Sequence, residues 1–266
     1  MITFSRLGNW GRLGNQMFQY AMMYSVSKRN GFDFWYPHDY YENGIMLNEC
    51  FSNVYVNENK PTDFPTNEYE ESGWGYDPLV FEQPDGTDYI GYFQNPKYFS
   101  GFEDDLREHF TFKEEIQNAA LNTFNKLPKN KELISLHVRR TDYLNLNGLY
   151  NNLELDYYQN CLADHGATDS VALIFSDDVE WCVENFKLDT PYAVVDTRGF
   201  GSVGPYIEMC MMTQCDVNVM ANSSFSWWAA WLGQTKKVYA PKHWFNPKTQ
   251  SHINYDGFYN KEWILK

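Results

Sequence analysis

The 266-residue chain is poor in basic residues and has no long hydrophobic segment. Lysine and arginine total 21 against 35 aspartate and glutamate residues, which gives a formal net charge of −14. Nucleic acids and anionic surfaces attract broad basic patches, so this charge excludes a general nucleic-acid binder. No apolar run approaches the roughly 20 residues that span a bilayer, and residues 1–6 lack the apolar core of a secretory signal. We expect a cytoplasmic protein without a transmembrane segment, and a peripheral membrane association stays open.

Cysteine is sparse, and its pattern does not indicate disulfides. The five cysteines are odd in number and include no Cys-x-x-Cys pair. Most lie in apolar segments of helical character, which favours buried free thiols in a reducing compartment.

Patterns that hold metal ions are also missing. The sequence contains no Asp-x-Asp, and its six histidines are scattered without the spacing of metal ligands. We therefore expect no metal and no cofactor. Negative charge that develops in a reaction would have to be stabilised by fixed cations and N–H donors.

The most informative segment is His137-Val138-Arg139-Arg140-Thr141-Asp142-Tyr143, which follows an apolar run at 132–136 that predicts a buried strand. Open α/β sheets hold their ligands at the carboxyl ends of strands. A guanidinium stays protonated, and its planar fork suits a phosphate. This segment alone supports two interpretations equally: Arg139 and Arg140 bind an anion, or they only pair with carboxylates such as Asp142.

A glycine-rich segment near the amino terminus is the second candidate. A predicted strand at 2–7 leads into glycines 8, 11 and 14, and a predicted helix begins at Gln16 and stops at Gly31. This layout places a phosphate at a helix N-terminus. The spacing is not Gly-x-Gly-x-x-Gly, which disfavours a dinucleotide site, and a glycine loop without a ligand is an equal alternative.

The rest of the pattern predicts two α/β halves. Residues 38–88 show little periodicity and predict irregular structure in the first half, and Tyr89–Gln94 predicts a strand after it. From residue 132 onward, strands and helices alternate, which indicates a parallel sheet flanked by helices. With a linker at Pro128–Lys131, we expect domains at 1–130 and 131–240. The tail at 241–266 is expected to pack across both.

Three further sites follow predicted strands or lie in apolar helices. Asp177 and Asp178 end a strand, and they either serve the site or only cap the next helix. Ala221–Trp228 begins another helix, whose exposed amides and hydroxyls suit a phosphate or carboxylate. Glu208 lies in an otherwise apolar helix, where a carboxylate is costly unless paired. A guanine edge or an internal arginine would pair it.

Three blocks resemble the α-1,2-fucosyltransferases of glycosyltransferase family 11. They are Gly11–Ala21, His137–Tyr143 and Ala221–Trp228, in the family's order, and Gly91–Phe99 is similar to another segment of these enzymes. The resemblance implies a GT-B-like α/β fold of two Rossmann-like domains with a more irregular N-terminal half. It also implies inverting, metal-independent transfer of L-fucose from GDP-β-L-fucose to the 2-hydroxyl of a galactose-containing glycan. In this arrangement domain 131–240 would bind GDP-fucose.

The same resemblance implies roles for individual residues. Arg139 would face the β-phosphate and act in catalysis with Asn15, and Arg140 would be more structural. Asp142 would orient the arginines rather than act as a base, and Glu208 would face guanine, although an Asp is expected there. The implied donor-binding residues are Gly14, Asn15, His137, Arg139, Arg140, Glu208, Ser223, Ser224 and Phe225; supporting candidates are Arg12, Asp177 and Asp178, and acceptor candidates are Tyr92 and Gln94.

Several alternatives stay open. A fucosyltransferase of another linkage or acceptor would carry the same motifs. A non-catalytic carbohydrate-binding protein could use the aromatic residues, which make up 18% of the chain, but it would not need arginines and a glycine loop arranged for a diphosphate. An NAD-dependent protein would need an acidic residue after the first glycine loop at ribose-binding spacing, and none is present. The base is either an acceptor-side carboxylate of the first half or absent.

We predict that excess EDTA leaves the rate of fucose transfer unchanged, because fixed arginine and N–H groups take the role of a metal. The rate is measured with labelled GDP-fucose and a galactose-terminated acceptor. Strong inhibition that added Mg²⁺ or Mn²⁺ reverses would contradict this expectation.

Overall fold

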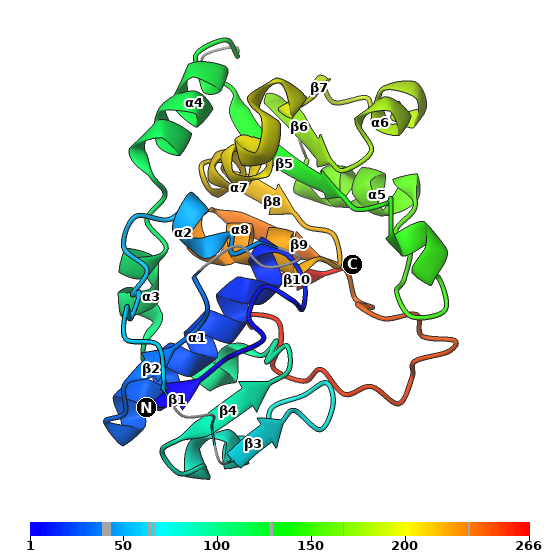
Figure 1. Ribbon diagram of the computed structural model, residues 1–266. Coiled ribbons are helices and arrows are strands. Elements are labelled where there is room, and N and C mark those ends of the chain that lie inside the picture. Colours follow the sequence, from blue (N-terminus) through cyan, green and yellow to red (C-terminus); the bar gives the residue numbers. More distant parts are fainter. Residues whose placement is uncertain (39–43, 63–64, 66, 128–129, 167, 234) are drawn as a thin grey trace. The chain divides into compact units, whose positions relative to one another are not determined.

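The structure is a computed structural model that describes residues 1–38, 44–62, 65, 67–127, 130–166, 168–233 and 235–266. The chain divides into two compact units (Figure 1). Unit 1 comprises Met1–Lys113 and Ile253–Tyr259, and unit 2 comprises Glu114–His252 and Asn260–Lys266. The division therefore falls earlier than the domain boundary expected at residue 130. Residues 128 and 129 of the expected linker lie outside the described residues.

In the described part of unit 2, six parallel strands form one sheet in the order β10-β9-β8-β5-β6-β7. The chain starts in the middle with β5, builds outward through β6 and β7, and then returns to the other side of β5 with β8. This order reverses between β5 and β8, which is the arrangement of a Rossmann-like unit. The strands are β5 (Glu132–Val138), β6 (Ser170–Ser176), β7 (Tyr192–Val194), β8 (Val217–Val219), β9 (Lys237–Ala240) and β10 (Ile264–Leu265).

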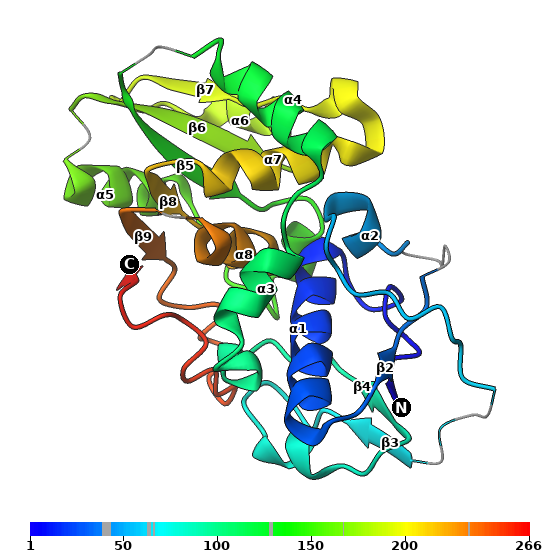
Figure 2. The same cartoon turned by 90° about the vertical axis from the view of Figure 1, so that its left-hand side faces the viewer.

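Helices cover both faces of this sheet (Figure 2). Helix α4 packs beside α7, and α7 packs beside α8. Helices α5 and α6 share the other core with alternate residues of the central strands, as the period of two in a strand requires. The helices of unit 2 are α4 (Glu114–Phe124), α5 (Leu155–His165), α6 (Val179–Asn185), α7 (Gly204–Thr213) and α8 (Ser224–Leu232), with 3-10 helices η3 (Tyr143–Leu146) and η4 (Arg198–Val203).

The alternation that the sequence indicated from residue 132 is confirmed: short, mostly apolar strands alternate with helices from β5 to β9. Every residue of β6 is buried, which is typical of a strand covered on both faces. The packing of α4 on α7 explains why the division between the units precedes this helix.

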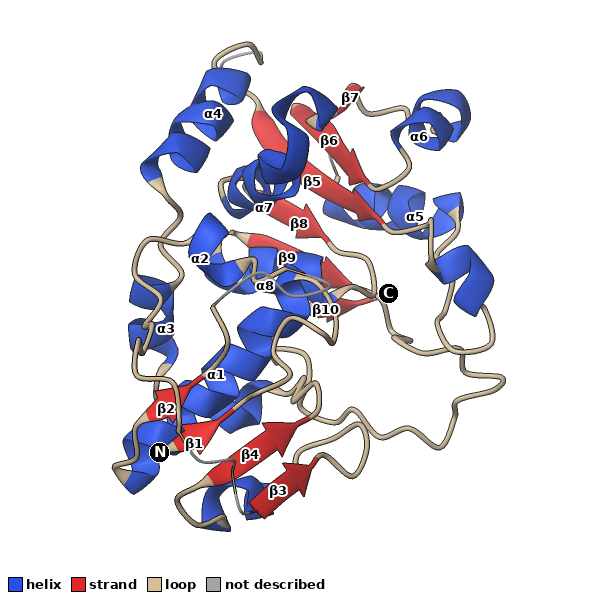
Figure 3. Ribbon diagram, in the orientation of Figure 1, coloured by secondary structure: helices blue, strands red, loops and turns tan. Residues whose placement is uncertain are grey.

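Unit 1 contains a smaller parallel sheet in the order β2-β1-β4-β3 (Figure 3). Here the order reverses between β1 and β4. The elements are β1 (Ile2–Thr3), β2 (Phe34–Trp35), β3 (Asn67–Glu70), β4 (Thr87–Ile90), α1 (Leu13–Asn30), α2 (Leu47–Cys50), α3 (Glu103–His109), and the 3-10 helices η1 (Pro78–Glu82) and η2 (Pro96–Phe99).

Three expectations for unit 1 were wrong in detail. Strand β1 ends at Thr3 and not at residue 7, because the Ser5 amide donates to the Asp88 carboxylate of β4 (2.8 Å) and the chain turns. Strand β3 lies inside the stretch expected to be irregular, and its exposed polar residues gave no alternating pattern. Strand β4 ends at Ile90, so residues 91–94 lie after the strand rather than in it.

Helix α1 begins at Leu13, and Gly14 and Asn15 therefore lie in its first turn rather than in a glycine loop. Its end is as expected: Lys28 and Arg29 occupy the last turn, and Gly31 adopts φ 70° in the left-handed region.

All five cysteines are buried free thiols, as expected. Within the described ranges, no helix is both long and apolar enough to cross a membrane.

We predict that Leu136→Ala lowers the free energy of unfolding by about 2–5 kcal/mol, because Leu136 is fully buried in the central strand β5 and its loss leaves a cavity. Leu121→Ala is the control, since Leu121 on α4 is 52% exposed and its loss should change little. Urea denaturation followed by circular dichroism measures both. Equal losses would contradict the burial of Leu136.

Candidate active site

The candidate site of unit 2 lies at the carboxyl ends of β5 and β8, where the strand order reverses. Residues 139–143 follow β5, and residues 220–223 follow β8. The Tyr143 hydroxyl of the first loop donates to the Asn222 carbonyl of the second (3.0 Å). The ring centroids of His137, in β5, and Phe225, in α8, lie 5.4 Å apart. The crevice outside such a reversal is where open α/β sheets bind ligands. The fold therefore brings together two of the segments that the sequence singled out.

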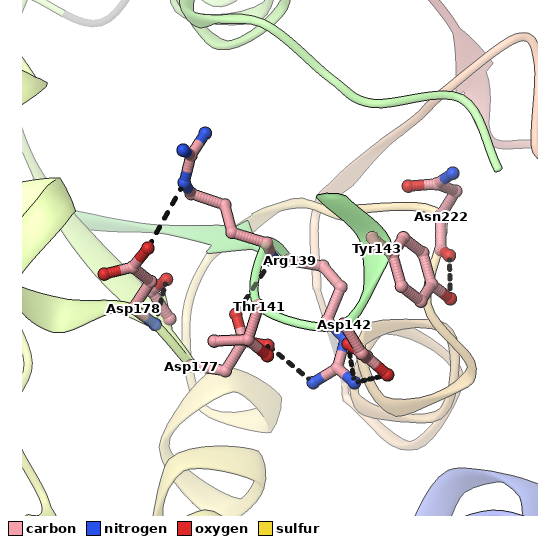
Figure 4. Close-up of polar contacts among 9 residues, drawn as sticks. Arg139, Thr141, Asp142, Tyr143, Asp177, Asp178 and Asn222 are labelled. Atoms are coloured by element: carbon pink, nitrogen blue, oxygen red, sulfur yellow. Dashed lines mark hydrogen bonds and ion pairs between the residues drawn. The ribbon is translucent and has the colours of Figure 1, made fainter. Parts of the chain in front are cut away.

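Arg139 is held by two carboxylates and one aromatic ring (Figure 4). Its Nη1 lies 2.9 Å from Asp177 Oδ2, and its Nη2 lies 2.6 Å from Asp142 Oδ1. The guanidinium carbon lies 5.3 Å from the centre of the Tyr143 ring, within cation–π range. A guanidinium has five N–H donors, so these two carboxylates do not use its full capacity.

Asp177 also holds the backbone that carries Arg139. Its Oδ1 accepts the Arg140 amide at 2.9 Å, and its Oδ2 accepts the Thr141 hydroxyl. Asp177 follows β6, so this side chain bridges the ends of two neighbouring strands. Its role therefore goes beyond capping a helix.

Arg140 points to a different partner. Its Nε lies 3.4 Å from Asp178 Oδ2, and its guanidinium stacks on the Trp181 ring at 3.5 Å. Asp178 is the N-cap of α6 and accepts the Trp181 amide at 3.2 Å. Capping, which the sequence left open for both aspartates, is confirmed for Asp178.

Arg139 and Arg140 are therefore both paired with carboxylates, which was one of the two interpretations of this segment. Two arginines and three aspartates (Asp142, Asp177 and Asp178) give this cluster a formal charge of −1. Asp142 is the most exposed of the three, with 46% of its side chain accessible. An anion that approaches Arg139 would compete with Asp142 rather than with the more buried Asp177.

His137 contributes a buried, neutral imidazole. It is 5% exposed, and burial lowers its pKa to about 4. Its Nδ1 has no hydrogen-bond partner among the described residues. Since buried polar atoms are almost always paired, this nitrogen is a candidate contact for a ligand or a water molecule.

The loop after β8 ends at the N-terminus of α8. Ser223 is the N-cap by position, but its side chain makes no capping bond, and Ser224 begins the helix. The first N–H groups of a helix lack partners within the helix and favour anions. Asn222 anchors the loop by donating to the carbonyls of Asn151 and Trp244, at 2.8 and 2.7 Å.

Glu208 lies on α7 and is largely buried. Burial raises its pKa to about 7, and the Asp177 and Asp196 carboxylates raise it further, while a hydrogen bond from the Thr197 hydroxyl lowers it. The Glu208 carboxylate is therefore paired with the Thr197 hydroxyl. Within the described residues it is not paired with an internal arginine, which was one of the two partners that the sequence allowed. Thr197 follows β7, and no sequence pattern singled it out.

In unit 1, the side chains of Asn15 and Gln94 are joined. Gln94 Nε2 donates to Asn15 Oδ1 at 2.8 Å. Tyr92 lies beside Gln94 in the segment after β4, Gly14 is buried, and Arg12 is exposed at the N-cap of α1. In the described residues, no group of three or more His, Cys, Asp or Glu side chains is placed to hold a metal ion.

Two parallel sheets, each with a reversal of strand order, make this an α/β protein of two Rossmann-like units. A sequence profile of glycosyl transferase family 11 matches residues 6–266. The chain therefore belongs to glycosyltransferase family 11.

Curated relatives in bacteria and primates share this similarity. The O-antigen biosynthesis glycosyltransferase WbnK of Escherichia coli is 30% identical over 181 residues, which are 64% of this chain and 59% of the relative. An alpha-1,2-colitosyltransferase of Escherichia coli is 28% identical over 268 residues, 88% of this chain and 90% of the relative. Galactoside alpha-(1,2)-fucosyltransferase 2 of Pongo pygmaeus is 25% identical over 86% of this chain and 69% of its own.

Solved structures agree on the fold. The crystal structure of NodZ alpha-1,6-fucosyltransferase soaked with GDP-fucose has a TM-score of 0.56 at 15% identity, over 87% of this chain and 92% of that chain. POFUT1 in complex with GDP has a TM-score of 0.56 at 14% identity, over 90% and 97%. The expected GT-B-like α/β fold class is confirmed.

We predict that Asp177→Asn lowers the free energy of unfolding by about 1–3 kcal/mol at pH 7, because three donors lose a charged acceptor. Asp142→Asn is the matched control. Asp142 is half-exposed, and exposed ion pairs contribute at most about 1 kcal/mol. Urea denaturation compares the two variants, and a larger loss for Asp142→Asn would contradict the bridging role of Asp177.

Proposed function

We propose that this protein transfers L-fucose from GDP-β-L-fucose to the 2-hydroxyl of a galactose-containing glycan, with inversion and without a metal, to form an α-1,2 linkage. The observation that carries the proposal is the position of Arg139. In a chain of glycosyltransferase family 11, it follows the central strand at the reversal of strand order and is oriented by Asp177 and Asp142. The curated relatives named for α-1,2 transfer support the linkage.

Arg139 is assigned to the leaving group. When the bond between sugar and diphosphate breaks, negative charge grows on the β-phosphate. A fixed guanidinium lowers the energy of that charge without having to reorganise. Asp177 and Asp142 keep Arg139 in one orientation, so Asp142 serves as an orienting partner.

The remaining donor contacts follow from the same crevice. The first N–H groups of α8, with Ser223, Ser224 and Phe225, would meet the nucleotide, and the Nδ1 of His137 would gain a partner there. Arg140 supports the loop through Asp178.

Glu208 is assigned to guanine. Guanine presents two neighbouring N–H donors on one edge, and a carboxylate accepts both. With a pKa of about 7, Glu208 is half-ionised near neutral pH, and two N–H donors would favour its charged form.

Unit 1 is assigned to the acceptor, with Tyr92 and Gln94 as contact residues. Asn15, which Gln94 holds, and Gly14 would meet the diphosphate and sugar of the donor. Arg12 is exposed and supports the same region.

A second candidate donor follows from one relative. The alpha-1,2-colitosyltransferase covers nearly the same length of chain as the fucosyltransferases do. GDP-colitose is therefore the competing donor, and a direct comparison of kcat/KM for GDP-fucose and GDP-colitose decides between them.

We predict that Arg139→Ala lowers kcat for fucose transfer by about 100-fold or more, because one strong donor to the leaving group is lost. Arg139→Lys should also be impaired, since an ammonium lacks the planar fork. Transfer is followed with labelled GDP-fucose and a panel of galactose-terminated acceptors.

Thermal melting provides the control. GDP should raise the melting temperature of the wild type through preferential binding to the folded state, and NAD should not. An Arg139→Ala variant that melts normally and keeps full activity would remove Arg139 from the mechanism. No shift with saturating GDP would contradict the donor assignment.

A further inference from the structure

Unit 1 has its own reversal of strand order, between β1 and β4. The segments that leave the carboxyl ends of these strands meet there. Gln94, after β4, donates to Asn15 at the start of α1, and the Trp10 and Tyr92 rings lie 5.9 Å apart. By the rule that places ligands at such reversals, this edge of the sheet is a candidate binding site of unit 1.

A carboxylate reaches this edge from the neighbouring strand. Glu71 directly follows β3, and its amide donates to the Ile90 carbonyl at 2.8 Å, which continues the pairing with β4. Its Oε2 accepts the backbone amides of Tyr92 and Phe93, at 2.8 and 2.9 Å. One carboxylate oxygen thus carries both bonds, and the side chain remains partly exposed.

The backbone is strained where Glu71 holds it. Gly91 adopts φ 153°, and a Cβ built there would lie 2.5 Å from the Glu71 Cβ, so only glycine fits. Phe93 has φ 50°, a value that is costly for an aromatic residue. Its ring is fully buried, packed against Phe4 at 6.0 Å. Such strain persists only where the surroundings impose it, and it concentrates at functional sites.

Tyr92 in this turn is partly exposed, as are the neighbouring rings of Trp74 and Trp10. Tyr92 and Trp74 are stacked, with centroids 5.6 Å apart and an interplanar angle of 10°, and Trp10 flanks Tyr92. Aromatic surfaces with a few convergent polar groups are typical of small-molecule sites, and flat rings of this kind pack against sugar rings. The polar groups here are Gln94, Asn15 and Glu71.

The surroundings of Glu71 affect its protonation. Burial raises its pKa to about 7, although the Phe93 and Tyr92 amides lower it. The titratable groups that face it are the phenols of Tyr69 and Tyr98, whose pKa values burial raises above their ordinary range, so both are neutral near pH 7. A carboxylate of this kind can exchange a proton near neutral pH.

We propose that Glu71 is the general base of the transfer, at an acceptor subsite formed with Tyr92, Trp74 and Gln94. The proposal rests on the proposed function. The acceptor hydroxyl loses its proton to Glu71, and its oxygen forms the bond to the anomeric carbon. The bond from that carbon to the β-phosphate oxygen breaks, and its electron pair leaves with GDP.

Glu71→Gln tests the assignment, because an amide oxygen can still accept the Tyr92 and Phe93 amides but cannot take the proton. The variant should melt close to the wild type and keep its GDP-induced shift, while kcat falls by about 100-fold or more. Glu70→Gln is the matched control, since Glu70 is exposed at the end of β3.

The pH dependence of kcat at saturating GDP-fucose gives a second readout. Below pH 7 Glu71 becomes protonated and cannot accept a proton, so the wild-type rate should fall as the pH falls. This decline should be absent in Glu71→Gln. Glu71→Asp keeps a carboxylate, and should keep the decline with a lower kcat even if Glu71→Gln does not fold.

Two outcomes overturn the proposal. If Glu71→Gln folds and retains the wild-type kcat and pH profile, Glu71 only anchors the turn, and the proposed function is untouched. If Glu71→Gln does not fold, the absence of the decline in Glu71→Asp, which keeps a carboxylate, excludes Glu71 as the base in the same way. If the wild type transfers sugar from neither GDP-fucose nor GDP-colitose to any acceptor, both the base assignment and the proposed function fail.

Discussion

The carboxylate of Asp177 is the contact on which the candidate site depends. A loop that leaves a parallel sheet no longer has the interstrand hydrogen bonds that pair backbone N–H and C=O groups within the sheet. A buried backbone N–H without another partner is costly in free energy. Asp177, from the end of β6, accepts the Arg140 amide and the Thr141 hydroxyl in the loop after β5. It also fixes the guanidinium of Arg139 at 2.9 Å. One side chain therefore accepts hydrogen bonds from the loop and orients the guanidinium of Arg139.

In both units, a carboxylate that follows one strand holds the loop that follows the neighbouring strand. In unit 1, Glu71 follows β3 and accepts two amides from the loop after the neighbouring strand β4. In unit 2, Asp177 follows β6 and accepts one amide and one hydroxyl from the loop after the neighbouring strand β5. The electrostatics differ. Asp177 contacts the guanidinium of Arg139, whereas Glu71 accepts neutral backbone N–H donors and burial raises its pKa to about 7. A carboxylate in the same position thus suits the orientation of Arg139 in unit 2 and the proposed proton transfer by Glu71 in unit 1.

The arginine segment shows why two interpretations of one motif need not exclude each other. The pairing of Arg139 with carboxylates, taken alone, is a structural explanation. Yet a long side chain that is left free would occupy many rotamers, and orienting it beforehand is what an electrostatic role requires. Asp142, which is 46% exposed, is the partner that an approaching anion would most readily replace.

The elements from β5 to β9 and the stop of α1 at Gly31 follow from the sequence, because they depend on local periodicity and glycine conformation. Residue chemistry also singled out the segment at 137–143, but not strand β10 in the tail. The tertiary structure decided what Asp177 and Glu71 contact. Their partners lie 37 and 21 residues away and become neighbours only when parallel strands pair in one register. Strand β3, whose exposed polar residues carry no periodic signal, exists because β4 supplies its hydrogen bonds.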